Sequence, residues 1–276
     1  MVNAASQAIK ANNPDAKVGA MSLTYLSRTQ DDTANGILAP GKYFNEAVSA
    51  GIGNHIDAVT LHPYGGGKNS VESRNLSETI RQYKDTLAEN GKDNILVWNT
   101  ELGYTTALTG DEDTKGKLNS RSAIHFKSQN TGNIQMFYNF AKKGTVATDQ
   151  EDQYGMVSGG YDECKRYGKN FLPTRSYVML AAHNYIMANA GFEQSFDSDN
   201  LYVSKFTSGK FGKKIVTLYR ESGSGNVRMS LGANSVEVYD CMGNKTLLTS
   251  EDGVYVFNAT DAPVYIVGDI AEVGIE

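Results

Sequence analysis

The stretch Asn94-Ile95-Leu96-Val97-Trp98-Asn99-Thr100-Glu101-Leu102-Gly103-Tyr104 is the segment around which the rest of the chain is ordered. Residues 95–98 form a short apolar run with the length and composition of a buried strand. The run passes into polar residues and the carboxylate of Glu101, with a glycine and an aromatic residue close behind. Catalytic groups of α/β barrels often lie at such a point, because the strand fixes the carboxylate and the loop leaves it accessible. The alternative is a glutamate that only begins a solvated loop.

The composition is that of an ordinary globular protein. The 276 residues suffice for one large domain or two, with 40% hydrophobic and 21% charged residues. A net charge of -5 and the lack of a basic run argue against nucleic-acid or membrane partners. No segment has transmembrane length, and the N-terminus lacks the pattern of a signal peptide. Neither the four histidines nor the two cysteines have metal-ligand spacing, so no metal site is predicted.

Helices and strands are expected to alternate over the first 190 residues. Strands are predicted at 18–26, 56–61, 95–98 and 133–140, and helices at 2–11, 43–50, 76–87, 118–126 and 172–190. This order predicts parallel strands joined by right-handed crossovers. Each strand ends in polar or aromatic residues before a longer loop, which is the polarity of a TIM barrel with its active site at the carboxyl ends. The loop charges Asp31-Asp32 and Asp111-Glu112-Asp113 are predicted to be solvated.

The pattern changes after Gly191, where strands follow one another without helices. They are predicted at 201–206, 214–220, 226–231, 235–239, 254–258 and 264–267. Gly243-Asn244 and Asp252-Gly253 mark turns, and the second pair is also a hairpin signal. These residues predict a small antiparallel β-sandwich that either covers one flank of the barrel or binds carbohydrate.

Only four strand–helix units precede this domain, whereas a closed barrel needs eight. The predicted fold class is therefore α/β plus β. Residues 1–191 would form the second half of a (β/α)8 TIM barrel, strands 5–8, beginning inside the helix that follows the fourth strand. Residues 192–276 would form the C-terminal β-sandwich domain.

The series of strand ends resembles the second half of a clan A glycoside hydrolase, the retaining (β/α)8 enzymes that include families 5, 30, 39 and 51. Residues 18–25 would be the fifth strand. Asp57-Ala58-Val59-Thr60-Leu61-His62-Pro63-Tyr64 resembles the sixth, which often ends in His-x-Tyr. Trp98-Asn99-Thr100-Glu101-Leu102-Gly103 resembles the seventh, whose Thr-Glu or similar pair carries the nucleophile. Phe137-Tyr138-Asn139-Phe140 would be the eighth, and residues 235–240 with 262–266 resemble the β domain of families such as 39.

The resemblance implies a role for each strand-end residue. Glu101 would be the nucleophile, the Tyr64 hydroxyl would orient its carboxylate, and His62 would bond to a sugar hydroxyl. Further substrate-binding residues would be Asn99, Tyr25, Tyr104 and Tyr138. Structural roles are the alternatives: Tyr64 packing on Pro63, His62 bonded to backbone, and tyrosines that only pack.

One family feature is missing. Clan A enzymes carry the acid/base glutamate in an Asn-Glu pair at the end of the fourth strand, whereas Asn45-Glu46 here lies in a predicted helix. The resemblance implies that the acid/base lies upstream of Met1, so the isolated chain is expected to be inactive or very weak.

The predicted function is thus a fragment of a retaining β-glycosidase that hydrolyses β-linked oligo- or polysaccharide, without metal or organic cofactor. Its protein partner would be the missing N-terminal half of the barrel or a second copy of itself. The family implies a secreted or extracellular enzyme. The alternative is a non-catalytic carbohydrate-binding or structural protein derived from a glycosidase.

Overall fold

The computed structural model describes residues 1–24, 30–64, 70, 72–73, 76–131, 150, 153–158 and 172–276. These residues fall into two compact units, one built on Met1–Gly103 with Thr131, and the other on Tyr104–Asn130 together with the described residues from 150 onward. The division into these units lies at a different place from the predicted domain boundary after residue 191. That domain boundary stays a prediction. Within the described ranges, no helix is long and apolar enough to cross a membrane.

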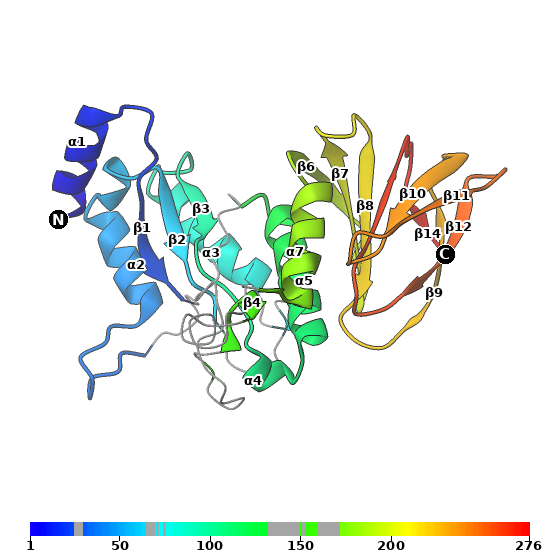
Figure 1. Ribbon diagram of the computed structural model, residues 1–276. Helices are drawn as coiled ribbons and strands as arrows, with labels where there is room; N and C mark the ends of the chain where they lie inside the picture. Colours follow the sequence, from blue (N-terminus) through cyan, green and yellow to red (C-terminus); the bar gives the residue numbers. More distant parts are fainter. Residues whose placement is uncertain are drawn as a thin grey trace. The chain divides into compact units, whose positions relative to one another are not determined.

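The first unit contains a three-stranded parallel sheet. Its order is β1-β2-β3, formed by β1 (Gly19–Leu23), β2 (Ala58–Leu61) and β3 (Leu96–Asn99) (Figure 1). The accompanying helices are α1 (Val2–Asn12), α2 (Pro40–Ser49), the short 3-10 helix η1 (Ile52–Asn54) and α3 (Leu76–Glu89). The parallel pairing of these three predicted strands is confirmed. The fourth, 133–140, lies outside the described residues.

The two faces of this sheet are covered to different degrees. All of β2 is buried, as expected for the central strand of a parallel sheet. In β3, Val97 is buried, whereas Leu96 is 48% exposed and Trp98 is half-buried. A Cβ atom on Gly19 would lie 2.9 Å from Thr60 Cγ2 and 3.5 Å from the Trp98 ring, so these side chains share one face. We call the face carrying Gly19, Thr60, Leu96 and Trp98 the Trp98 face.

The second unit begins with helices and a short β pair. These elements are α4 (Thr106–Thr109), α5 (Glu112–Ser128), β4 (Val157–Ser158), β5 (Leu172–Pro173) and α7 (Arg175–Ile186). The prediction of a helix from residue 172 with Pro173 in its first turn is wrong. Pro173 instead pairs with Val157, and the hydroxyl of Thr174 caps the helix by accepting from Tyr177 N–H.

Two antiparallel sheets follow. The first has the order β11-β10-β13-β8-β7-β6, and the second has the order β12-β9-β14. The strands are β6 (Ala190–Ser195), β7 (Leu201–Ser208), β8 (Lys214–Arg220), β9 (Gly225–Ser230), β10 (Ser235–Tyr239), β11 (Lys245–Thr249), β12 (Val254–Ala259), β13 (Val264–Gly268) and β14 (Gly274–Ile275). Antiparallel strands over this region were predicted and are present, but β6, β11 and β14 were not foreseen.

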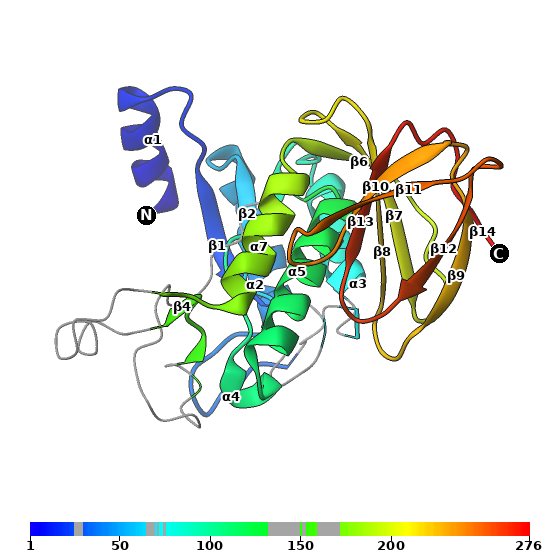
Figure 2. The ribbon, with the colours of Figure 1, turned by 45° about the vertical axis from the view of Figure 1, so that its right-hand side comes forward.

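The six-stranded sheet carries a hydrophobic core on each face. Val216 and Leu218 of β8 pack with Val227 and Phe257 of the three-stranded sheet. On the other face, strand residues pack with Ile124 of α5 and with residues at the end of α7. Figure 2 shows the six-stranded sheet between these two helices and the smaller sheet.

The turn predicted at Gly243-Asn244 is present, whereas the hairpin predicted at Asp252-Gly253 is wrong. Around Gly243, β10 and β11 pair in register, with Tyr239 opposite Lys245. Around Asp252-Gly253, β11 and β12 belong to different sheets, and the Gly253 carbonyl accepts a hydrogen bond from Leu231 N–H at 2.9 Å. The turn therefore carries the chain from one sheet to the other.

Buried His183 ties α7 to the sheet. Its Nδ1 lies 3.1 Å from Tyr265 Oη of β13. Burial, with a smaller contribution from Lys127, lowers the pKa of His183 to about 3. The imidazole is therefore neutral in the folded protein at any pH near neutrality.

We expect His183 to make stability depend on pH. The unfolded state binds a proton near pH 6.5 and the folded state only near pH 3, so stability falls as the pH drops below about 6.5. From pH 6.5 to 5 the contribution is about 2 kcal/mol. Urea midpoints at pH 7 and 5 should converge in His183→Gln, which cannot titrate. An unchanged difference between the two midpoints would contradict this prediction.

Candidate active site

The carboxyl ends of β2 and β3 lie side by side, and the backbone holds the residues just beyond them. Leu61 is in register with Asn99, the last residue of each strand. One residue further, Thr100 N–H donates to Leu61 O at 3.2 Å and His62 N–H donates to Leu23 O at 2.7 Å. The sheet thus fixes the backbone of His62 and Thr100 although neither belongs to a strand.

Glu101 and His62, predicted from separate strands, meet at this edge. Glu101 Oε2 lies 3.6 Å from His62 Nδ1, with the two side chains 30% and 28% exposed. His62 Nε2 lies 3.0 Å from Thr100 Oγ1. Turning Nδ1–H towards the carboxylate leaves Nε2 to accept from the Thr100 hydroxyl, which fixes the ring. The result is a half-exposed carboxylate backed by an oriented imidazole.

Asn99 holds the backbone of the loop that carries Glu101. It is 1% exposed, and its amide nitrogen can donate to Glu101 O at 3.2 Å and Leu61 O at 3.3 Å. Both contacts are with backbone carbonyls. Asn99 was predicted to bind substrate, but in this geometry it holds the Glu101 backbone against β2.

Tyr64 lies in a tight turn directly after His62. Its backbone N–H donates to His62 O at 2.8 Å, which closes a three-residue turn. The turn keeps the half-buried Tyr64 side chain near the carboxyl end of β2. Its orienting role towards Glu101 stays a prediction.

Of the three tyrosines predicted to bind substrate, Tyr104 alone lies among the described residues. Tyr25 and Tyr138 lie outside the described residues. Tyr104 is 2% exposed, and its hydroxyl lies 3.3 Å from Ser122 Oγ of α5. Packing against α5 therefore leaves no face of the Tyr104 ring accessible to a sugar.

The acidic run 111–113 was predicted to be only solvated; Asp111 is exposed, but all three carboxylates also have protein partners. Asp111 caps α5 by accepting from Thr114 N–H at 2.7 Å. Glu112 accepts from Ser176 Oγ at 2.6 Å, and Asp113 accepts from Arg175 Nε at 2.7 Å. An aspartate directly before a helix whose first turn holds two further acidic residues is an N-cap signal in the sequence. Asp31 was likewise expected in solvent but accepts from Ala39 N–H at 2.7 Å.

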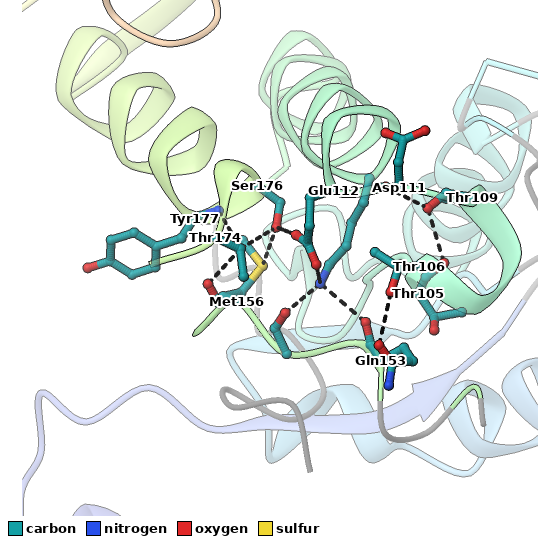
Figure 3. Close-up of polar contacts among 12 residues, drawn as sticks. Thr105, Thr106, Thr109, Asp111, Glu112, Gln153, Met156, Thr174, Ser176 and Tyr177 are labelled. Atoms are coloured by element: carbon teal, nitrogen blue, oxygen red, sulfur yellow. Dashed lines mark hydrogen bonds and ion pairs between the residues drawn. The ribbon is translucent and has the colours of Figure 1, made fainter. Parts of the chain in front are cut away.

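A buried lysine was not foreseen at all. Lys115 is 0% exposed, and its Nζ donates to Gln153 O at 3.2 Å and to Gly155 O (Figure 3). Glu112 Oε1 lies 3.6 Å away as the counter-charge. The network also includes Thr105 and Thr106, four and five residues after Glu101, which contact Gln150 O and Gln153 Oε1. Lys115 therefore holds together the segments that follow the candidate nucleophile.

Removing the Lys115 ammonium should destabilise the protein. In Lys115→Met, buried carbonyls and Glu112 lose their charged donor, which should lower the free energy of unfolding by about 2–4 kcal/mol. Lys17→Met is the matched control, because Lys17 is exposed and lies 3.6 Å from Asp57. Urea denaturation measures both. An equal loss of unfolding free energy in the two variants would show that the buried contacts of Lys115 stabilise the protein no more than an exposed ion pair does.

No group of three or more His, Cys, Asp and Glu side chains suited to a metal ion occurs in the part of the chain that the structure describes. The Glu101 carboxylate, 30% exposed beside His62, is the candidate reactive group of this site. An accessible carboxylate at the end of a parallel strand can attack an electrophilic carbon or hold a developing positive charge.

Comparison with known proteins gives matches at the level of structure. No family model and no curated protein sequence matches the chain. A family 39 glycoside hydrolase from the gut symbiont Bacteroides cellulosilyticus WH2 matches with a TM-score of 0.66 and 19% identity, over 82% of this chain and 47% of that one. A GH51 alpha-L-arabinofuranosidase from Thermotoga petrophila RKU-1 matches with a TM-score of 0.63 and 12% identity, over 96% and 60%. A glucosidase from Croceicoccus marinus matches with a TM-score of 0.59 and 11% identity, over 96% and 63%.

The chain spans about half the length of the first of these proteins and about three-fifths of the other two. At sequence identities this low, the matches are evidence for the fold alone. The comparisons show that this chain shares its fold with part of a family 39 and part of a GH51 glycoside hydrolase, two of the families that its strand ends resemble.

Proposed function

We propose that this chain is part of a retaining β-glycosidase in which Glu101 is the nucleophile. The observation that carries the proposal is the position of Glu101, directly beyond a parallel strand and 3.6 Å from His62. A retaining enzyme needs an ionised carboxylate that attacks the anomeric carbon, while a second carboxyl group protonates the leaving oxygen. His62, presented beside the carboxylate, is suited to bond to a hydroxyl of the sugar being attacked.

The three described parallel strands would be strands 5–7 of a (β/α)8 barrel, with the sandwich as its C-terminal domain. The acid/base would then come from a further part of the barrel, because the resemblance places it on the fourth strand. The substrate would be a β-linked oligo- or polysaccharide. The family resemblance also favours work outside the cell for the parent enzyme.

Covalent labelling tests the role of Glu101 without requiring an acid/base. We would use 2-deoxy-2-fluoro glycosides with a dinitrophenolate leaving group. The dinitrophenolate departs without help from an acid, and the sugar remains trapped as the glycosyl-enzyme. We expect mass spectrometry to find one of the xylo-, gluco- or mannosides on the peptide containing Glu101. Turnover of unactivated phenyl glycosides should be low, since losing one of two cooperating carboxyl groups costs several orders of magnitude.

Glu101→Gln is the control for this labelling, because it keeps the shape of the side chain but cannot attack. Absence of label from the wild-type protein with all three sugars, or label on another residue, would contradict the assignment. Rapid hydrolysis of phenyl glycosides that disappears in Glu101→Gln would show that the chain holds an acid/base of its own.

The proposed half-barrel should associate. β1 is at the edge of its sheet among the described strands, and Leu96 on the Trp98 face is 48% exposed. Edge strands invite pairing, and parallel sheets are normally covered on both faces. We expect the missing half of the barrel, or a second copy of this chain, to pair with this edge and to cover the Leu96 end of the face, leaving the carboxyl ends of the strands open.

Light scattering at micromolar concentration should show a mass above the 30.0 kDa of one chain. Leu96→Lys should shift the protein towards monomer, whereas Leu247→Lys, at the 64% exposed Leu247 of β11, should not. A monodisperse wild-type monomer with a cooperative melt would overturn this prediction.

The alternative is a non-catalytic carbohydrate-binding protein. One observation favours it, a hollow of about 330 Å³ between Thr207, Lys213 and Asp269 in the second unit. Saccharide binding that survives Glu101→Gln but is lost in Lys213→Ala would support this alternative over the enzyme.

A further inference from the structure

β1 carries a strained two-residue bulge near its carboxyl end. Ala20 is in register with Val59 and Leu23 with Leu61, so both Met21 and Ser22 lie opposite the single residue Thr60. Met21 and Ser22 have φ values of 99° and 49°. Positive φ is unfavourable for residues with side chains, and it persists only where neighbouring groups hold it. Bulges of this kind re-aim side chains and are over-represented at barrel rims and beside active sites.

The Thr60 hydroxyl holds the bulge in place. Its Oγ1 accepts from Ser22 N–H at 2.8 Å and lies 3.2 Å from Ala20 O, to which it donates. Ser22 Oγ also lies 3.2 Å from Thr60 Oγ1. A hydroxyl has one proton and two lone pairs. Since the Thr60 proton is used by Ala20, Ser22 Oγ–H must be the donor in the contact between the two hydroxyls.

This arrangement leaves Ser22 Oγ as an acceptor. Its proton points to Thr60, so both of its lone pairs are directed away from that contact. The Ser22 side chain is exposed, whereas Thr60 is buried. An oriented acceptor suits a ligand that brings hydroxyl donors, and it gives no attraction to a carboxylate or phosphate.

The Ser22 hydroxyl lies beside that of Thr60, which belongs to the Trp98 face. Thr60 precedes His62 by two residues. A strand rises about 3.3 Å per residue, so Ser22 lies roughly 7 Å along the sheet from His62. One hydroxylated ring with its substituents can bridge such a separation. The acceptor and the carboxyl-edge group His62 are therefore placed to contact the same saccharide.

We propose that Ser22 is a saccharide-binding residue whose Oγ accepts a hydrogen bond from a hydroxyl group of the β-linked sugar held at Glu101. This assignment rests on the proposed function and adds a specificity contact on β1. The strained bulge is what turns the serine hydroxyl towards the ligand, and Thr60 fixes it as an acceptor.

Calorimetry with xylotriose, cellotriose and mannotriose tests the proposal. Loss of one neutral hydrogen bond in Ser22→Ala should weaken binding of the preferred sugar about 2- to 10-fold. Ser22→Gly should show the same loss, because glycine accepts positive φ and keeps the bulge while lacking the hydroxyl. Ser49→Ala, at an exposed serine ending α2, is the matched control and should bind like wild type.

Monodeoxy analogues of the preferred sugar identify the partner hydroxyl. Wild type should bind one analogue about 2- to 10-fold more weakly than the parent sugar, and Ser22→Ala should not distinguish the two. Wild-type affinity in both Ser22→Gly and Ser22→Ala, with Glu101 still labelled by the fluoroglycoside, would overturn the role of Ser22 alone. Absence of both binding and label in the wild-type protein would overturn the proposed function and this assignment with it.

Discussion

Two backbone hydrogen bonds beyond the ends of the strands hold the candidate site together. His62 N–H bonds to Leu23 O of β1, and Thr100 N–H bonds to Leu61 O of β2, although neither donor belongs to a strand. The parallel register therefore continues one step into each loop. Asn99 closes the arrangement by reaching both Leu61 O and Glu101 O. With the backbone fixed on both sides, the Glu101 carboxylate is positioned by its own side-chain torsions and by His62.

The second unit depends on a helix that is buried on nearly every side. Lys115, Asn119, Ser120 and Ser122 of α5 are all fully buried, which is unusual for polar residues and explains the weak amphipathic pattern of this helix. Such burial is tolerable only when the polar atoms find partners. Carbonyl groups of residues 153 and 155 provide them for Lys115. Gly116 permits the close approach of α7, because a Cβ there would lie 2.5 Å from Met179 Sδ.

The six-stranded sheet works as the middle layer of that unit because its strands alternate between two cores. In β8, Val216 and Leu218 face the three-stranded sheet, whereas Ile215 and Tyr219 face the helices. Side chains of successive residues point to opposite faces of a sheet, so a strand covered on both faces reads as a continuous apolar run. This is why β8 was easy to predict from sequence. The edge strand β11, with its mostly exposed side chains, was not.

The sequence by itself determined the alternation of helices and parallel strands, the change to antiparallel strands near residue 190, and the placement of His62 and Glu101 at the ends of neighbouring strands. These follow from local periodicity and from the rule that parallel strands bring their carboxyl ends to one edge. Only the tertiary structure decided that Asn99 bonds to backbone, that Tyr104 is buried, that Lys115 has no exposure and that the exposed Ser22 bonds to Thr60. Each depends on partners distant in the chain, such as Thr60 for Ser22 and Gly155 for Lys115. A hydrogen bond between residues 38 or 40 positions apart leaves no periodic trace in the sequence, because only the packed chain brings its donor and acceptor together.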